Sequence, residues 1–118
     1  MRAGAHPLPP LQSGAQGRGG GDRPATAIAI DTPDVRVVLF RLAPGQQVPP
    51  HTSPSTVVLN VLAGQGWVVG AEGERSCRAG EVIAYAPEER HGMHAGDREL
   101  IIAATIAPRP GRVAEVAA

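Results

Sequence analysis

The most informative residues of this chain are Gly45-Gln46-Gln47-Val48-Pro49-Pro50-His51-Thr52-Ser53, followed closely by Val57-Val58-Leu59-Asn60-Val61-Leu62-Ala63-Gly64. They open with a glycine turn, place one histidine after two prolines, and then pass into an aliphatic, partly β-branched run that ends at a second glycine. His91 stands downstream of another apolar run, which also begins at a glycine, Gly80. Two strands that each carry a histidine toward one place would form a site.

Short apolar runs separated by turn residues extend from this stretch in both directions. We predict strands over residues 26–30, 35–42, 56–62, 67–69, 75–78, 81–85 and 99–106. Glycine, proline and aspartate predict chain reversals at 31–34, 63–66, 70–74 and 96–97. Between residues 25 and 107 no run has helical periodicity over the length of an ordinary helix, and the turns recur about every 8–12 residues. This pattern predicts an all-β sandwich or small barrel.

The composition changes at about residue 24. Residues 1–24 are rich in glycine, proline and arginine, and their only large aliphatic side chains besides Met1 are Leu8 and Leu11. Such a segment buries too little surface to offset the entropy lost on ordering it. We therefore predict a flexible N-terminal tail over residues 1–24 and a single β-barrel domain over residues 25–118, which suits a chain of 118 residues.

The charge balance excludes several classes of partner. Eleven arginines and no lysine balance eleven acidic residues, so the formal net charge is zero, and we expect neither nucleic acid nor a membrane surface as a partner. No run approaches the ~18 apolar residues that span a bilayer, and no signal-peptide-like run stands at the start. The single Cys77 cannot form an internal disulfide, and we expect a structural role for it. These features predict a cytoplasmic protein.

The spacing of the glycines and histidines resembles the paired motifs of the cupin superfamily. The first motif of that family reads G-x5-H-x-H-x3-E-x6-G. This chain fills its five fixed positions with Gly45, His51, Ser53, Val57 and Gly64. The first histidine is retained, but serine replaces the second histidine and valine replaces the glutamate.

The second family motif reads G-x5-P-x-G-x2-H-x3-N. Gly80 and His91 match it, whereas Ala86, Glu88 and Ala95 stand at the other fixed positions. The resemblance covers about residues 35–106. It implies a small single-domain, RmlC-like cupin: a double-stranded β-helix, or jelly-roll, barrel with a degenerate metal-binding motif.

The same resemblance implies a metal site and a dimer. In the family, the two histidines and the glutamate of the first motif and the histidine of the second point into the barrel and hold a metal, and many members are dimers. Only His51 and His91 remain here, so the resemblance implies these two as ligands of one divalent iron, zinc or manganese ion. His94 would join them only if a β-bulge after Gly92 turned it inward. We also expect a homodimer, for which the edge of a strand over residues 26–30 is suited.

Strand alternation predicts which side chains line the barrel, because successive residues face opposite sides of a sheet. If His51 points inward, the alternate residues that follow it do so too, and Met93 shares the face of His91. The predicted lining residues are His51, His91, Ser53, Val57, Leu59, Val61, Trp67, Tyr85 and Met93. They would form an apolar pocket with two imidazoles and few other polar groups, as is typical of small-molecule sites.

Three hypotheses for function follow. In the first, the barrel binds a small organic molecule without a metal, because Ser53 and Val57 replace two ligands. In the second, the barrel is an enzyme. It is either a metal-dependent enzyme of the dioxygenase or isomerase/cyclase type that uses His51 and His91, or a metal-free enzyme. In the metal-free enzyme an imidazole acts as general base and Tyr85 donates a hydrogen bond to an oxyanion. In the third, the barrel face and the tail bind another protein. The metal content of the purified protein separates the first two.

Overall fold

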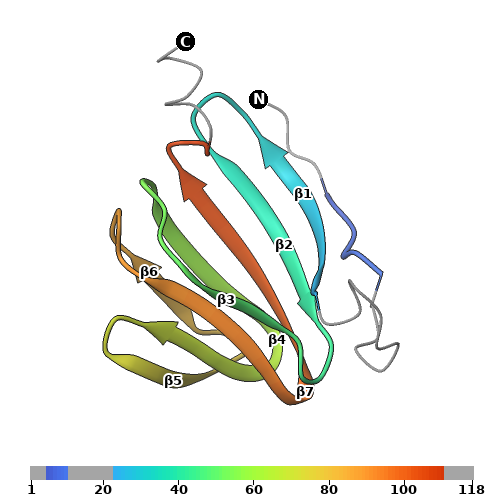
Figure 1. Cartoon of the computed structure of the whole chain (residues 1–118). Helices are drawn as coiled ribbons and strands as arrows, with labels where there is room; N and C mark the ends of the chain where they lie inside the picture. The colour runs from blue at the N-terminus through green and yellow to red at the C-terminus, as the bar shows by residue number, and fades with distance from the viewer. Residues whose placement is uncertain (1–4, 11–22, 111–118) are drawn as a thin grey trace.

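The computed structural model of the chain describes residues 5–10 and 23–110 (Figure 1). In this part of the chain the secondary structure consists of seven β-strands and no helix, which confirms the predicted all-β fold. The strands are β1 (Ala25–Asp31), β2 (Arg36–Leu42), β3 (Gln47–His51), β4 (Thr56–Gly70), β5 (Gly73–Arg78), β6 (Val82–Tyr85) and β7 (His91–Ala107). None of the residues described forms a helix that could span a membrane.

The two long strands, β4 and β7, pair with each other and hold the other five. Residues 56–64 of β4 pair with residues 100–107 of β7, and this layer is completed by β6 next to β4, by β2 next to β7 and by β1 next to β2. Residues 66–69 of β4 pair with residues 92–95 of β7 in a second layer, which β3 and β5 flank. Figure 1 shows β1 and β2 on one side of the molecule and β5 on the other, with β4 and β7 curving between them.

Two of the four predicted chain reversals are wrong. Residues 63–66 lie inside β4 and residues 96–97 lie inside β7, so both strands continue past their glycines. The register between β4 and β7 shifts at these places, first between Val61 and Ala63 and again between Gly64 and Gly66. Such bulges bend a strand and increase its twist without reversing it. The bends carry β4 and β7 from one layer into the other.

Gly64 makes the bend in β4 possible. Its φ is +79°, a left-handed conformation that side chains other than glycine rarely adopt. A Cβ atom on this residue would lie 1.9 Å from the carbonyl oxygen of Glu99 on the neighbouring strand β7. The glycine is therefore required both by the backbone conformation and by the close approach of β7.

The core lies between the two layers. Its buried members are Leu42, Val57, Leu59, Val61, Val68, Cys77, Tyr85, Met93, Ala95, Leu100, Ile102 and Ala104. The alternation predicted for β4 holds over Val57, Leu59 and Val61, which all face inward. Cys77 belongs to the core, and its burial raises the pKa of the thiol, which makes the thiol less reactive and agrees with a structural role.

Part of the N-terminal segment contacts the barrel. Pro9 is buried, and Nη1 of Arg41 on β2 donates a hydrogen bond of 3.3 Å to its carbonyl oxygen. Arg41 also forms an ion pair of 2.8 Å with Glu99. Of the tail predicted over residues 1–24, residues 1–4 and 11–22 lie outside the described residues, as do residues 111–118 of the predicted domain. The flexibility of the tail stays a prediction.

Candidate functional site

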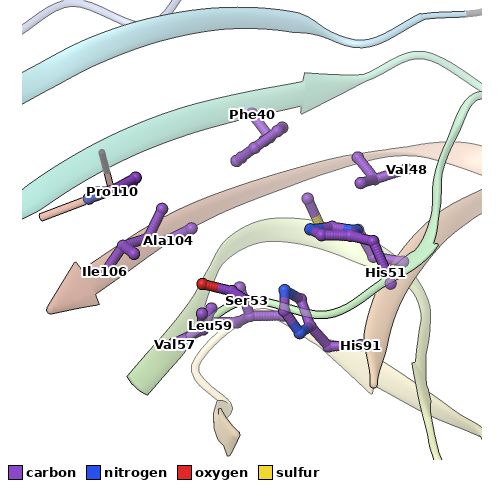
Figure 2. Close-up of a pocket in the computed structure, with 12 residues that line it drawn as sticks. Phe40, Val48, His51, Ser53, Val57, Leu59, His91, Ala104, Ile106 and Pro110 are labelled. Carbon is purple, nitrogen blue, oxygen red and sulfur yellow. The ribbon is translucent and has the colours of Figure 1, made fainter. Parts of the chain in front are cut away.

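A cavity of about 240 Å³ lies between the two layers of the barrel (Figure 2). Its walls are mostly aliphatic and aromatic, and its polar side chains are those of His51, His91 and Ser53. The lining residues are Phe40, Val48, His51, Ser53, Val57, Leu59, His91, Gly92, Met93, Ala104, Ile106 and Pro110. An apolar cavity with a few polar groups is the usual form of a small-molecule site.

The turn that precedes β3 holds the start of this strand against β7. Gln46 is fully buried, and its side-chain Oε1 accepts a hydrogen bond of 2.7 Å from the backbone N–H of Ala43. The Gln46 carbonyl in turn accepts a hydrogen bond from the N–H of Ala95 on β7. Pro49 and Pro50 lack the N–H that a central strand needs, and β3 is indeed an edge strand that pairs only with β7 among the described strands.

His51 is the last residue of β3 and pairs with His91, the first residue of β7. The register of the two strands shifts between Val48 and His51, which is a bulge of the kind that re-aims a side chain beside a site. His91 is 7% exposed, whereas His51 is exposed. His91 therefore lies inside the cavity and His51 lies at its mouth.

The loop that leads into His91 is held by Ser53. The backbone N–H of Glu88 donates a hydrogen bond of 2.7 Å to the carbonyl oxygen of Ser53. Glu88 has a φ of +67°, the only positive value of a residue other than glycine among the described residues. It stands at the motif position where the cupin pattern has a glycine, the residue that adopts a positive φ most readily.

Backbone contacts determine which nitrogen of each ring carries a proton. Nδ1 of His51 lies 2.9 Å from the carbonyl oxygen of Pro49, and Nδ1 of His91 lies 3.0 Å from that of Glu89. A carbonyl oxygen only accepts hydrogen bonds, so both Nδ1 atoms are donors. In the neutral rings both Nε2 atoms are then acceptors. The ring centroids are 4.3 Å apart at an interplanar angle of 60°, and both rings border the cavity (Figure 2).

Ser53 supplies the third polar side chain. Its Oγ accepts a hydrogen bond of 3.1 Å from the backbone N–H of Ser55. Within the described part of the chain its hydroxyl proton has no acceptor of its own, and Ser53 borders the cavity opposite the aliphatic wall of β7. The cavity therefore offers two acceptors and one hydroxyl donor.

Pro110 closes one end of the cavity from beyond the last strand. The hydroxyl of the buried Ser55 donates a hydrogen bond of 2.6 Å to the carbonyl oxygen of Pro108. Arg109 forms an ion pair with Asp31 at the end of β1. Hydrogen bonding from Arg109 is the largest cause that lowers the pKa of Asp31 below its usual value. These contacts hold residues 108–110 against the barrel.

The family of the chain follows from a comparison of its sequence with known protein families. The pattern of a family described as "AraC-like ligand binding domain" matches residues 36–118, which is more than half of the chain. The chain belongs to this family. No curated protein sequence matches it.

Solved structures similar to this AraC-like ligand binding domain confirm the predicted double-stranded β-helix barrel. An RmlC-like cupin protein from Desulfovibrio desulfuricans has a TM-score of 0.75 at 22% identity, covering 92% of this chain and 98% of that chain. A conserved protein with a double-stranded β-helix domain from Klebsiella pneumoniae has a TM-score of 0.70 at 24% identity, with 78% and 83% covered. KdgF from Halomonas sp. has a TM-score of 0.70 at 20% identity, with 76% and 84% covered. At these identities the likeness concerns the fold.

The metal implied by the cupin resemblance does not fit the donors of this AraC-like ligand binding domain. Catalytic zinc usually has three protein ligands, and non-haem iron usually has two histidines and a carboxylate. Here Val57 occupies the carboxylate position and lines the cavity with a side chain that cannot bind a metal. Across residues 5–10 and 23–110 no three histidine, cysteine, aspartate or glutamate side chains are grouped closely enough to hold a metal ion.

The side chains that could have supplied a third ligand face elsewhere. His94 lies on the outer face, where its ring stacks on Trp67 with centroids 5.1 Å apart, and its Nε2 lies 2.8 Å from Oε1 of Glu74. Glu89 accepts a hydrogen bond from the N–H of Ala86 in its own turn, and Glu88 is exposed. No bulge turns His94 inward.

We expect the purified domain to contain far less than one equivalent of iron, zinc or manganese per chain, because two imidazoles and a hydroxyl form an incomplete ligand set. Elemental analysis by mass spectrometry after gel filtration measures this. The double variant His51→Ala, His91→Ala is the control and should have the same low metal content. One equivalent of a single metal in the wild type that disappears in the double variant would contradict the expectation.

Six of the nine predicted lining residues border the cavity: His51, His91, Ser53, Val57, Leu59 and Met93. Val61 lies in the core but does not border the cavity. Trp67 lies on the outer face and is 38% exposed. Tyr85 is buried next to His91, with ring centroids 5.2 Å apart, and its hydroxyl donates a hydrogen bond of 2.9 Å to the carbonyl oxygen of Val69. Its proton is therefore engaged with the backbone and is not directed at the cavity.

Several lining residues were not predicted: Phe40, Val48, Gly92, Ala104, Ile106 and Pro110. Phe40 comes from β2, and Ala104 and Ile106 come from the second half of β7, the strand that pairs with both β2 and β4. Alternation within the predicted strands at 35–42 and 99–106 could have identified these three residues as facing inward. Pro110 lies beyond every strand, so alternation could not have identified it.

Proposed function

We propose that the barrel binds a small organic molecule in the cavity between its two layers. The observation that carries this proposal is the cavity itself, a space of about 240 Å³ with mostly apolar walls and three polar side chains at one place. A cavity of 150 Å³ is known to hold a benzene molecule. A volume of this size therefore suits a ligand of roughly ten non-hydrogen atoms.

Membership of a family described as a ligand binding domain supports the proposal. One structural neighbour is named as a DMSP lyase, DddQ from Ruegeria pomeroyi, so a similar barrel acts on a small molecule in another protein. DddQ is a distant neighbour at 17% identity, and the match covers only 47% of its chain. The metal-dependent enzyme that the sequence left open has weaker support, because Val57 removes the carboxylate ligand.

Ligand-detected NMR with a library of uncharged fragments tests the proposal. We expect several fragments to bind the purified protein and to raise its melting temperature progressively as the fragment concentration increases. Competition between fragments would place them in one site. The proposal would be wrong if no fragment of the library showed saturable binding.

We also propose that the domain forms a homodimer through β1. This strand pairs with β2 along one edge, and no described strand pairs with the other edge. Its residues 25–30 include neither a charged residue nor a proline, although natural edge strands usually carry such protection. Ile28 and Ile30 are 49% and 41% exposed. The register with β2 shifts between these two residues, which pair with Val38 and Val37 and so face opposite sides of the sheet, and a second copy of β1 at this edge would flank both.

For the dimer, we expect Ile28→Lys to shift the mass measured by light scattering from that of two chains to that of one. The reason is that lysine on an edge strand opposes pairing with another strand. Leu62→Lys is the matched control, because Leu62 on β4 is also 49% exposed and lies away from β1. A wild type that is monomeric at high micromolar concentration would rule out the dimer.

A further inference from the structure

We propose that the cavity selects uncharged, largely apolar alcohols or phenols, and that the ligand hydroxyl donates its hydrogen bond to the Nε2 atom of either His51 or His91, which act as acceptors instead of as metal ligands. This inference rests on the proposed function, because it specifies the chemistry of the molecule in that cavity.

The hydrogen-bond inventory of the cavity is the first argument. Both Nδ1 atoms are engaged with backbone carbonyl oxygens, so the neutral rings offer only their Nε2 acceptors to a ligand. The Oγ of Ser53 already accepts a hydrogen bond from Ser55, so Ser53 offers its hydroxyl proton. A hydroxyl group is the smallest group that satisfies both kinds of partner, since it donates through its proton and accepts through its oxygen.

The absence of charge around the cavity is the second argument. Among the described residues that border it, none is an arginine, an aspartate or a glutamate. An ammonium group that left water for this cavity would meet no opposite charge among these residues, and a carboxylate would meet one only if His51 or His91 took up a proton, so either ion loses its hydration with little in return. The cavity therefore discriminates against ligands that are charged at neutral pH.

The aliphatic wall is the third argument. Phe40, Leu59, Ala104 and Ile106 line the cavity from the layer that faces the histidines, and Val48 lines it from β3 beside His51. A ligand with several hydroxyl groups would therefore leave most of them without partners. Conversely, a pure hydrocarbon would exclude water from the Nε2 acceptor of the buried His91 without replacing it. The favoured ligand has an apolar body with one hydroxyl at the histidine end.

The loss of the family's metal ligands agrees with this arrangement. Val57 extends the apolar wall to the position where the cupin pattern has a carboxylate, and Ser53 places a donor where that pattern has a third imidazole. Both replacements remove a metal ligand, and both suit an uncharged ligand that carries a hydroxyl. The two imidazoles that remain are 4.3 Å apart between their centroids, close enough for one hydroxyl to reach either ring.

Isothermal titration calorimetry with four probes that share a phenyl body tests this inference. The probes are 2-phenylethanol, propylbenzene, phenylacetate and 2-phenylethylammonium, in buffer with and without a chelator. We expect 2-phenylethanol to bind at least tenfold more tightly than each of the others, with no effect of the chelator. Equal or tighter binding of propylbenzene or either ion, or a requirement for added zinc, manganese or iron, would overturn the inference.

Variants assign the selectivity to the two rings. We expect His51→Phe and His91→Phe each to reduce the preference for 2-phenylethanol over propylbenzene at least threefold, because phenylalanine keeps the ring but not the acceptor. His51 is exposed, so its variant tests the idea even if the variant of the buried His91 fails to fold. His94→Phe is the matched control outside the cavity and should keep the preference. An unchanged preference in a folded His51→Phe variant would count against the role of the rings.

The two proposals fail in different ways. If none of the four probes binds and the uncharged fragment library also gives no binding, the proposed function itself is wrong. If the library yields saturable binders that are charged or lack a donor group, the cavity binds ligands but the hydroxyl selectivity is wrong.

Discussion

Gly64→Ala is expected to lower the free energy of unfolding by about 2–5 kcal/mol. A left-handed residue other than glycine costs about 1–2 kcal/mol, and forcing a group into packed structure costs about 1–3 kcal/mol more. Both terms apply at Gly64, where φ is +79° and a Cβ atom would meet the carbonyl oxygen of Glu99 at 1.9 Å. Urea denaturation followed by circular dichroism measures the loss.

Gly45→Ala is the matched control for this prediction. Gly45 has nearly the same φ, +83°, but a Cβ atom there would have no neighbour within 4 Å. Only the conformational term applies, so we expect a loss of about 1–2 kcal/mol. Equal losses in the two variants would show that the close approach of β7 to Gly64 contributes nothing, and that the bend in β4 is not what requires the glycine.

Ala104→Leu is expected to weaken ligand binding by about ten- to a hundredfold, because clashes of about 1–3 kcal/mol are typical when a filled space receives a larger side chain. Ala104 is buried on β7 and borders the cavity between Leu59 of β4 and Val38 of β2, its pairing partners. In the ligand-free protein the added carbons enter empty space, so the melting temperature should stay the same or rise. Calorimetry with the best fragment and a thermal melt of the same sample measure both effects.

Ala103→Leu on the same strand is the control. Its side chain points to the opposite face of β7, away from the cavity, so the same substitution should leave the affinity for the fragment unchanged. Undiminished binding in Ala104→Leu, or an equal loss in both variants, would indicate that the fragment binds elsewhere.

The sequence was sufficient to predict the fold because the glycines and histidines agree in register with the cupin pattern over most of the chain. It was misleading at residues 63–66 and 96–97, where glycines were interpreted as turns. A glycine in a strand can mark either a turn or a bulge, and which of the two forms depends on the partner strand. In this protein the partner is β7, which lies so close to Gly64 that the two strands bend together.

The same bulges explain why Trp67 does not border the cavity. Val57, Leu59 and Val61 face inward, and unbroken alternation would continue this face to residue 67. The register shifts after Val61 and Gly64 reverse the alternation, so Val68 is buried and Trp67 faces outward. A shift of one residue turns every later side chain to the other face. Bulges are set by strand pairing, which a single sequence does not reveal.

The polar end of the cavity was largely predictable, and the apolar end was not. His51, His91 and Ser53 stand at motif positions, so the resemblance to the cupin pattern implied their convergence. Phe40 and Pro110 reach the cavity only through the pairing of β2 with β7 and through the contacts that hold residues 108–110. The protonation of both Nδ1 atoms likewise depends on backbone carbonyls that only the three-dimensional structure places.

The most direct test of the account is methyl NMR of the domain during titration with its best fragment. If the cavity is the ligand site, the shifts should concentrate on the methyl groups of Val48, Leu59, Met93, Ala104 and Ile106, which border it. The methyl groups of Leu62 and Val82, which are exposed on the outer surface, should not move. Saturable shifts at Leu62 and Val82 with none at the five cavity residues would contradict the account.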